Sequence, residues 1–161
     1  MRKLFFASFV ASTLAFMSML SVPAVADTCC GMALKCTIEL ELNLAPDEGE
    51  PDWDGSVDGD VTGIYQLWER WDEMFFTGPA EDPVVEHYFE DFVIVDGDNS
   101  IEGVDQGVFN LDNLKFHYTG SVTAATGEWS YLLGWNLHGQ GVVNFSEDEI
   151  TAIGTMALVP P

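Results

Sequence analysis

Apolar residues alternate with polar ones from Lys35 to Ala45, where every second position carries Ile38, Leu40, Leu42 or Leu44. This period of two predicts a half-buried strand. From Gly63 the apolar spacing changes to three and four residues, which predicts an amphipathic helix that ends at Gly78-Pro79. A second, shorter helix is predicted to begin at Asp82-Pro83. The apolar sides of the two helices would be formed by Ile64, Leu67, Trp68, Trp71, Met74 and Phe75, and by Val84, Val85, Tyr88, Phe89 and Phe92.

Strand-like patterns return near Asp91 and continue to the end of the chain. A turn is predicted at residues 96–100, where Asp-Gly-Asp-Asn-Ser separates two short strands. Long strands joined by short turns then predict an antiparallel meander. The predicted strands are Phe92–Val95, Ile101–Gly103, Leu114–Ala124, Glu128–Leu137, Gly141–Phe145 and Ile150–Leu158.

The N-terminal residues Met1–Ala26 have the three parts of a secretory signal peptide. Arg2 and Lys3 precede an apolar run, which ends in the small-residue site Ala24-Val25-Ala26. A membrane anchor is the alternative, but Pro23 and the small-residue triplet favour cleavage. We therefore expect a secreted or periplasmic protein whose mature chain begins at Asp27.

The mature chain would carry a strong negative charge. Three basic residues remain after cleavage against 27 acidic ones, a net charge of −24. Such a surface disfavours nucleic acid and anionic membranes as partners, and the sequence leaves a homodimer open. We divide the mature chain into residues 27–60, a cysteine-containing strand with an acidic linker, and residues 61–161, a single α+β domain.

Three cysteines lie together near the start of the mature chain, at Cys29, Cys30 and Cys36. In an oxidising compartment we expect one disulfide, between Cys36 and either Cys29 or Cys30. A strained bridge between the two adjacent cysteines and a three-thiolate metal site are the alternatives.

Four segments follow the order of the predicted elements: Leu67-Trp-Glu-Arg-Trp-Asp-Glu-Met-Phe-Phe-Thr-Gly, Val85-Glu-His-Tyr-Phe-Glu-Asp-Phe-Val-Ile-Val-Asp-Gly, Ser100-Ile-Glu-Gly-Val-Asp and Glu149-Ile-Thr-Ala-Ile. In this order they resemble the nuclear transport factor 2-like superfamily, in particular its SnoaL-like members, over about Val61 to Val159. The resemblance implies an α+β fold in which a curved antiparallel sheet wraps around N-terminal helices to form a cone with an apolar cavity. Because the superfamily includes isomerases, cyclases, dehydratases, hydrolases and non-catalytic binders, it implies no single chemistry.

Aromatic residues share one face of two predicted strands and are the candidates for lining that cavity. Strand alternation places them together and puts His117 and His138 on the opposite face, which disfavours either histidine as a catalytic base. Dense core packing is the alternative explanation of the same stripe. The candidate ligand-binding residues are Phe116, Tyr118, Trp129, Tyr131 and Trp135.

Two further candidates involve carboxylates. Asp96 would lie at the cavity mouth as a general base, unless it is only a turn residue. Asp54, Ser56, Asp58 and Asp60 match the start of an EF-hand-like calcium loop with glycine at its sixth position, but position twelve is Tyr65. A solvated acidic loop is the alternative there.

These patterns together predict an exported acidic protein that binds a small apolar or aromatic molecule. An isomerase, cyclase or dehydratase with Asp96 as base is the second hypothesis. The third is a surface or matrix protein stabilised by calcium, and calcium is the one cofactor that the sequence suggests.

Overall fold

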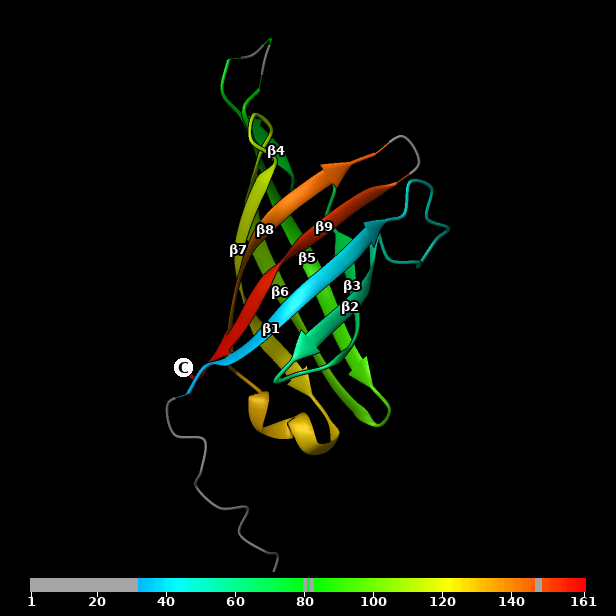
Figure 1. The fold of residues 1–161 in the computed structure, drawn as a ribbon, viewed down its shortest axis with the longest axis vertical. Coiled ribbons are helices and arrows are strands. Elements are labelled where there is room, and N and C mark those ends of the chain that lie inside the picture. The colour runs from blue at the N-terminus through cyan, green and yellow to red at the C-terminus, as the bar shows by residue number, and fades with distance from the viewer. Residues whose placement is uncertain (1–31, 80, 82, 147–148) are drawn as a thin grey trace, which may run out of the picture.

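A computed structural model describes residues 32–79, 81, 83–146 and 149–161. Those residues form nine strands and one short 3-10 helix (Figure 1). The strands follow the order β3-β2-β1-β9-β8-β7-β6-β5-β4, and every neighbouring pair is antiparallel. The elements are β1 (Leu34–Leu42), β2 (Trp53–Gly59), β3 (Gly63–Glu69), β4 (Phe75–Thr77), β5 (Val85–Asp96), β6 (Asn99–Asn110), β7 (Lys115–Ala125), η1 (Gly127–Leu132), β8 (Asn136–Phe145) and β9 (Ile150–Val159).

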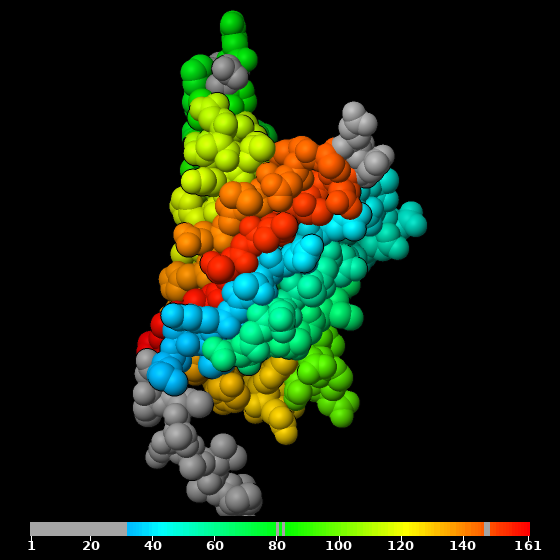
Figure 2. Space-filling model, viewed as in Figure 1, coloured from blue at the N-terminus to red at the C-terminus, as the bar shows by residue number. Residues whose placement is uncertain are grey.

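The sheet closes on itself into an eight-stranded barrel. β3 pairs with β5 over the stretch from Ile64↔Val95 to Glu69↔Glu90, which joins the two ends of the strand order. The short strand β4 continues the line of β3 along the same edge of β5. Figure 2 shows part of the wall as slanted bands of side chains from β2, β1, β9 and β8. β1 and β2, which belong to the segment before the predicted domain, are thus two strands of the same barrel.

The predicted α+β fold is therefore wrong, and so is the cone around N-terminal helices that the superfamily resemblance implies. Both predicted helices are strands: the first is β3 and β4, and the second is the start of β5. In the first, Tyr65 and Leu67 point inward with a period of two, while Ile64 is 56% exposed. Counting apolar residues from both faces of a strand produced a false helical spacing.

The second helix prediction failed because a carboxylate occupies an inward position. Tyr88, Phe92 and Ile94 alternate on the inner face of β5, and Glu90 lies between them, 6% exposed. This acidic residue interrupts the alternation by which a strand is recognised. The neighbouring β6 lacks a clean pattern for a related reason, because its inward positions include Gly103, Asp105 and Gly107.

Clean alternation was a reliable guide elsewhere. The predicted strands at Lys35–Ala45, Leu114–Ala124 and Ile150–Leu158 correspond to β1, β7 and β9. The antiparallel meander and the turn at residues 96–100 are also present, with Gly97 at a φ of 58°. The predicted strand Glu128–Leu137 is wrong, since most of it is η1 and the turn that follows. The acidic linker predicted within residues 27–60 contains β2, and the predicted strand Gly141–Phe145 is the second half of β8.

Aromatic rings fill the interior by lying over glycines on the adjacent strand. Tyr88 is paired directly with Gly107, and Tyr118 with Gly139. A Cβ atom at either glycine would collide with the tyrosine ring, so the absence of a side chain gives the ring its place. The same arrangement recurs at Phe92 over Gly103 and at Phe116 over Gly141.

The two ends of the barrel differ. At the lower end in Figure 1 lies η1, whose Leu132 is completely buried and whose Trp129 packs against the core. The backbone N–H of Glu128 donates to Asn99 Oδ1 (2.8 Å), which ties η1 to the β5–β6 turn. No helix among the described residues is long and apolar enough to cross a membrane.

Candidate binding cavity

A cavity of about 260 Å³ occupies the other end of the barrel. Every one of the eight barrel strands contributes to its wall, so the cavity is the open end of the barrel interior. Most of the lining is apolar: Leu40, Leu42, Trp53, Leu67, Trp71, Met74, Phe76, Tyr88, Phe109, Phe116, Val143, Phe145, Ile150 and Ala152. Interiors of eight-stranded barrels are wide enough to hold one small ligand.

Three carboxyl groups interrupt this apolar wall, and no described lining residue is basic. Glu69 ends β3, while Glu86 and Glu90 lie on the inner face of β5. Because residues two apart on a strand face the same side, Glu86, Tyr88 and Glu90 line up along the cavity. Burial raises the pKa of Glu86 above its ordinary value.

Glu69 is held in place by an indole donor to its side chain and by a carboxylate acceptor for its backbone N–H. The indole Nε1–H of Trp53 donates to Glu69 Oε1 (2.8 Å), and the backbone N–H of Glu69 donates to Asp52 Oδ2 (2.8 Å). Trp71 Nε1–H donates to the other oxygen of Asp52 (3.2 Å). Glu69 Oε2 is buried and has no hydrogen-bond partner in the described part of the chain.

The environment of Glu69 favours its neutral form. Burial is the main cause that raises its pKa to about 7, and the charges of Asp52 and Glu86 add to the effect. The hydrogen bond from Trp53 acts in the opposite direction because it stabilises the carboxylate. Near neutral pH this side chain can therefore take up or release a proton in response to a bound group.

Deeper in the barrel, Glu90 faces a second carboxyl across the β5–β6 pair. Glu90 and Asp105 are register partners, and they are 6% and 5% exposed. Burial and the nearby charge of Asp105 raise the pKa of Glu90 well above its ordinary value, and burial raises that of Asp105 to about 7. Two like charges in so dry a site cannot both form, so we expect the pair to retain at least one proton at neutral pH.

The surroundings of this pair leave polar atoms without partners. Apart from the hydrogen bonds that Asp105 can share with Glu90 and Tyr118 with Tyr65, the Asp105 carboxylate oxygens and the Tyr118 hydroxyl have no partner among the described residues. Burial raises the pKa values of Tyr65, Tyr88 and Tyr118, so all three stay neutral donors. Across from Asp105 lies Gly120, where a Cβ atom would collide with the aspartate side chain. Buried polar groups without partners are rare in proteins, so each one calls for an explanation.

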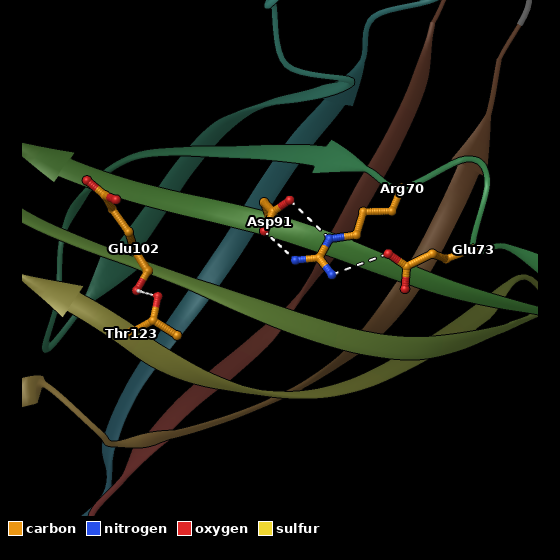
Figure 3. A network of polar contacts seen from close by, with 5 residues as sticks. All are labelled: Arg70, Glu73, Asp91, Glu102 and Thr123. Carbon is orange, nitrogen blue, oxygen red and sulfur yellow. Dashed lines mark hydrogen bonds and ion pairs between the residues drawn. The ribbon is translucent and has the colours of Figure 1, made fainter.

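The nearest arginine does not neutralise these interior groups. Arg70 follows Glu69 directly but turns to the outer surface, where it forms ion pairs with Asp91 (Nη2–Oδ1, 2.7 Å) and Glu73 (Nη1–Oε1, 3.5 Å) (Figure 3). Glu102 and Thr123, also drawn there, lie on the outer faces of β6 and β7, where Thr123 donates to the Glu102 carbonyl (3.4 Å). The acidic interior and the arginine therefore belong to opposite sides of the wall.

The structure divides the aromatic residues predicted to line one cavity. Phe116 lines the cavity, and Tyr118 lies deeper on the same inner face, with ring centroids 6.1 Å apart. Trp129, Tyr131 and Trp135 lie at the opposite end in and after η1, where the Tyr131 and Trp135 rings meet edge to face at 5.8 Å. His117 and His138 are exposed on the outer surface, as strand alternation predicted.

Asp96 does not reach the cavity. It lies exposed at the end of β5, paired with Asn99 beside the turn at the closed end of the barrel. The cavity carboxyls Glu69, Glu86 and Glu90 were not predicted from the sequence. Their signal was a polar residue at a position where strand alternation requires an inward side chain.

The residues of the predicted calcium loop are arranged along a strand. Asp54, Ser56 and Asp58 alternate on the outer face of β2, so their side chains do not converge as they would in a loop. Asp60 Oδ2 accepts the backbone N–H of Lys35 (2.8 Å), and Asp58 Oδ1 accepts the Thr62 hydroxyl (3.2 Å). Among the described residues no group of three or more His, Cys, Asp or Glu is arranged to hold a metal ion.

The predicted signal peptide, Cys29 and Cys30 lie outside the described residues. Cys36 faces the barrel interior as a buried thiol with no disulfide in the described part of the chain. Burial raises its pKa, which keeps it in the unreactive thiol form. The bridge to Cys29 or Cys30 stays a prediction.

Comparison with known proteins adds no assignment to this geometry. No protein-family model matches the chain, and neither a curated protein nor a solved structure is significantly similar to it. The cavity itself is thus the basis for any functional conclusion.

Proposed function

We propose that the protein binds a small, largely apolar or aromatic molecule in the open end of its barrel. The observation that carries this proposal is the cavity of about 260 Å³, which is walled by apolar side chains from all eight barrel strands and contains a few carboxyl groups. Pockets that bind small molecules have this composition, an apolar wall with a small number of polar groups that orient the ligand. Its volume is just below the usual range for drug-sized ligands, so the ligand is small.

The rim of the cavity supports the same function. Trp71, Phe76 and Phe145 all line the cavity and are 61%, 53% and 55% exposed. Exposed aromatic side chains around a concave opening are typical of a surface that is covered when a ligand is bound. The predicted export of an acidic protein is compatible with a carrier or binding protein that acts outside the cytoplasm.

Filling the cavity from one wall tests the proposal. Ala152 lies on the inner face of β9 at the cavity, and Ala157 lies on the outer face of the same strand. Ala152→Leu should lower the affinity for small aromatic ligands by about tenfold or more, because the added side chain occupies their space. The signal is the fluorescence of Trp53 and Trp71 in a titration with phenylbutanol.

The matched control is Ala157→Leu, which adds the same atoms outside the barrel and should leave the affinity unchanged. Equal effects of the two variants would contradict binding inside the barrel. A saturable signal that survives Ala152→Leu unaltered would do the same.

Acid–base catalysis in the same cavity is a second candidate function. The observation that favours it is the position of Glu90, a buried carboxyl at the cavity. Burial raises the pKa of Glu90, and a general acid that acts near neutral pH needs a raised pKa. This residue is better placed for such a role than Asp96. Turnover of a bound ligand that Glu90→Gln abolishes, with ligand affinity retained, would distinguish an enzyme from a binding protein.

A further inference from the structure

We infer that the ligand carries a positively charged nitrogen, an organic ammonium group, which binds among Glu69, Glu86 and Glu90 while its apolar part contacts the aromatic wall. This inference rests on the binding function proposed above and specifies the chemical class of the ligand. It follows from the charges, the unpaired oxygens and the ring content of the cavity.

The charges of the cavity are all of one sign. Glu69 comes from β3, and Glu86 and Glu90 come from β5. Asp52 lies just behind Glu69, where it accepts the backbone N–H of that residue. Asp105 lies behind Glu90 on β6. Three carboxyl groups therefore line the cavity on β3 and β5, and two more, from Asp52 and Asp105, lie behind them.

No basic group of the described chain faces this cavity. Lys35 and Lys115 are exposed on the outer surface, and Arg70 is paired with Asp91 and Glu73 there. His87 lies on the outward side of β5, where its ring stacks on Phe75 with centroids 4.4 Å apart. Buried carboxylates are normally paired with a cation, and this protein supplies none from its own described residues.

Several oxygens in this region lack the hydrogen bonds that their burial requires. Glu69 Oε1 accepts from Trp53, but Glu69 Oε2 has no partner. The oxygens of Asp105, a side chain only 5% exposed, have no partner among the described residues other than the neighbouring Glu90 carboxyl. An ammonium group is a cluster of charged donors with no acceptor, and it satisfies carboxylate oxygens by charge-assisted hydrogen bonds.

The aromatic lining fits the same ligand independently of the carboxyl groups. Trp53, Trp71, Tyr88, Phe109 and Phe116 all contribute to the cavity wall. The faces of such rings carry negative potential and attract organic cations, as in the aromatic cages that bind quaternary ammonium groups. A ligand with a carboxylate or a phosphate would meet repulsion from the same rings and carboxyl groups, on a chain whose full net charge is −22.

Protonation gives this inference a second observable. The pKa of Glu69 is raised to about 7, and the groups that face it are Asp52, Glu86 and the Trp53 indole. Glu90 is faced by the carboxyls of Asp105, Glu69 and Asp52 and by the neutral hydroxyls of Tyr65, Tyr88 and Tyr118. A bound cation lowers these pKa values, so its binding should release protons near pH 7 and should weaken as the pH falls from 7.5 to about 5.5.

The test uses three probes that share one hydrocarbon group and differ in charge: phenylbutylamine, phenylbutanol and phenylbutyrate. Each is titrated into the full mature protein at pH 7.5 and followed by tryptophan fluorescence and by calorimetry in two buffers of different ionisation enthalpy. The amine should bind about tenfold or more tightly than the alcohol, with proton release, and the butyrate should bind most weakly. A phenylbutyl-trimethylammonium probe, whose charge is fixed, should show the same loss of affinity at low pH.

Matched variants locate the charge effect. Glu69→Gln should reduce amine affinity toward that of the alcohol and should reduce alcohol affinity much less, because an amide can still accept the hydrogen bond from Trp53. Glu86→Gln is a second variant with the same expected direction. Glu102→Gln removes an equal charge from the outer face of β6 and should change none of the affinities.

The outcomes separate this inference from the function on which it rests. If the alcohol binds in the cavity at least as tightly as the amine, or if Glu69→Gln and Glu102→Gln weaken the amine equally, the cation inference fails while ligand binding stands. If none of the probes produces a saturable signal, the proposed binding function fails with it.

Discussion

The two ends of the barrel are built from the same strands but differ in nearly every physical property. At the closed end, Leu132 is 0% exposed and Trp135 is 7% exposed, and η1 is tied to the β5–β6 turn by hydrogen bonds. At the open end, Trp71 and Phe76 remain more than half exposed, and the cavity contains Glu69 and its neighbouring carboxyl groups. The chain itself closes one end with η1, and at the other end it leaves a cavity, which is the site of the proposed ligand.

This difference indicates how stability and function are divided in the molecule. Apolar side chains that are fully removed from water supply the stability, and the closed end and the barrel centre contain many of them. Buried carboxyl oxygens without partners reduce stability. They belong to Glu69, at the open end, and to Asp105, deeper in the barrel. Groups that cost stability are commonly retained where function needs them.

The largest expected effect is on the closed end. Leu132→Ala should lower the free energy of unfolding by about 3 kcal/mol, because it leaves a cavity under η1 where no water can compensate. Urea denaturation measures this change. The neighbouring Leu133, 58% exposed, is the matched control, and Leu133→Ala should cost less than about 0.5 kcal/mol. Similar losses from both would show that η1 does not seal the barrel.

A smaller effect should come from the buried carboxyl pair, and it should depend on pH. The pKa of Asp105 is about 7 in the folded protein, against an ordinary value of 3.8, so between these pH values the folded protein holds more protons than the unfolded chain. The stability that this proton contributes is complete below about pH 4 and is lost as the pH rises through 7.

Asp105→Asn replaces the carboxyl by a neutral group of the same shape. Its stability relative to wild type should increase by about 2 kcal/mol between pH 5 and pH 8, because in the variant no charge forms at this position as the pH rises. Thermal denaturation at the two pH values gives the comparison. Asp96→Asn, at an exposed turn, should leave the pH profile as it is. A parallel shift of the Asp105→Asn profile at all pH values would contradict a raised pKa.

The smallest effect on stability, with a distinct effect on binding, is expected at the rim. Phe76 and Phe75 are adjacent on β4, but Phe76 lines the cavity while Phe75 stacks on His87 outside. Phe76→Ala should cost less than about 1 kcal/mol of stability and weaken the binding of phenylbutylamine severalfold, because its ring covers the ligand. Phe75→Ala should leave binding unchanged, and equal binding losses would show that the ligand does not lie on the cavity side of β4.

The success of the sequence predictions followed the chemistry of the inward positions. On β1 and β7 the inward residues are nearly all apolar, and both strands were predicted within a few residues of their bounds. On β5 and β6 the inward positions hold Glu90 and Asp105 together with glycines, and there the alternation fails. Glycines that make room for aromatic rings, and carboxyl residues that point inward, both interrupt the alternation of apolar and polar residues by which a strand is recognised.

The same residues explain why the candidate site was only partly predicted. Phe116 was correctly placed on an inward face, and Tyr118 followed it. Glu69 was interpreted as part of a helix, and Trp135 was placed in a strand that does not exist. The false helical spacing thus concealed the carboxyl groups. On an amphipathic helix, acidic residues such as Glu69 belong to the polar face, whereas in the observed strands they point into the cavity.

The sequence by itself determined the acidic character of the chain, the antiparallel meander and the strands with clean alternation, because charge and short-range periodicity are local properties. Only the tertiary structure decided that the sheet closes. Closure depends on the pairing of β3 with β5, and the local alternation of apolar and polar residues does not say which strands pair. Closure also decided the function proposed here. Because the sheet closes, Glu69, Glu86 and Glu90 lie inside the barrel beside aromatic side chains.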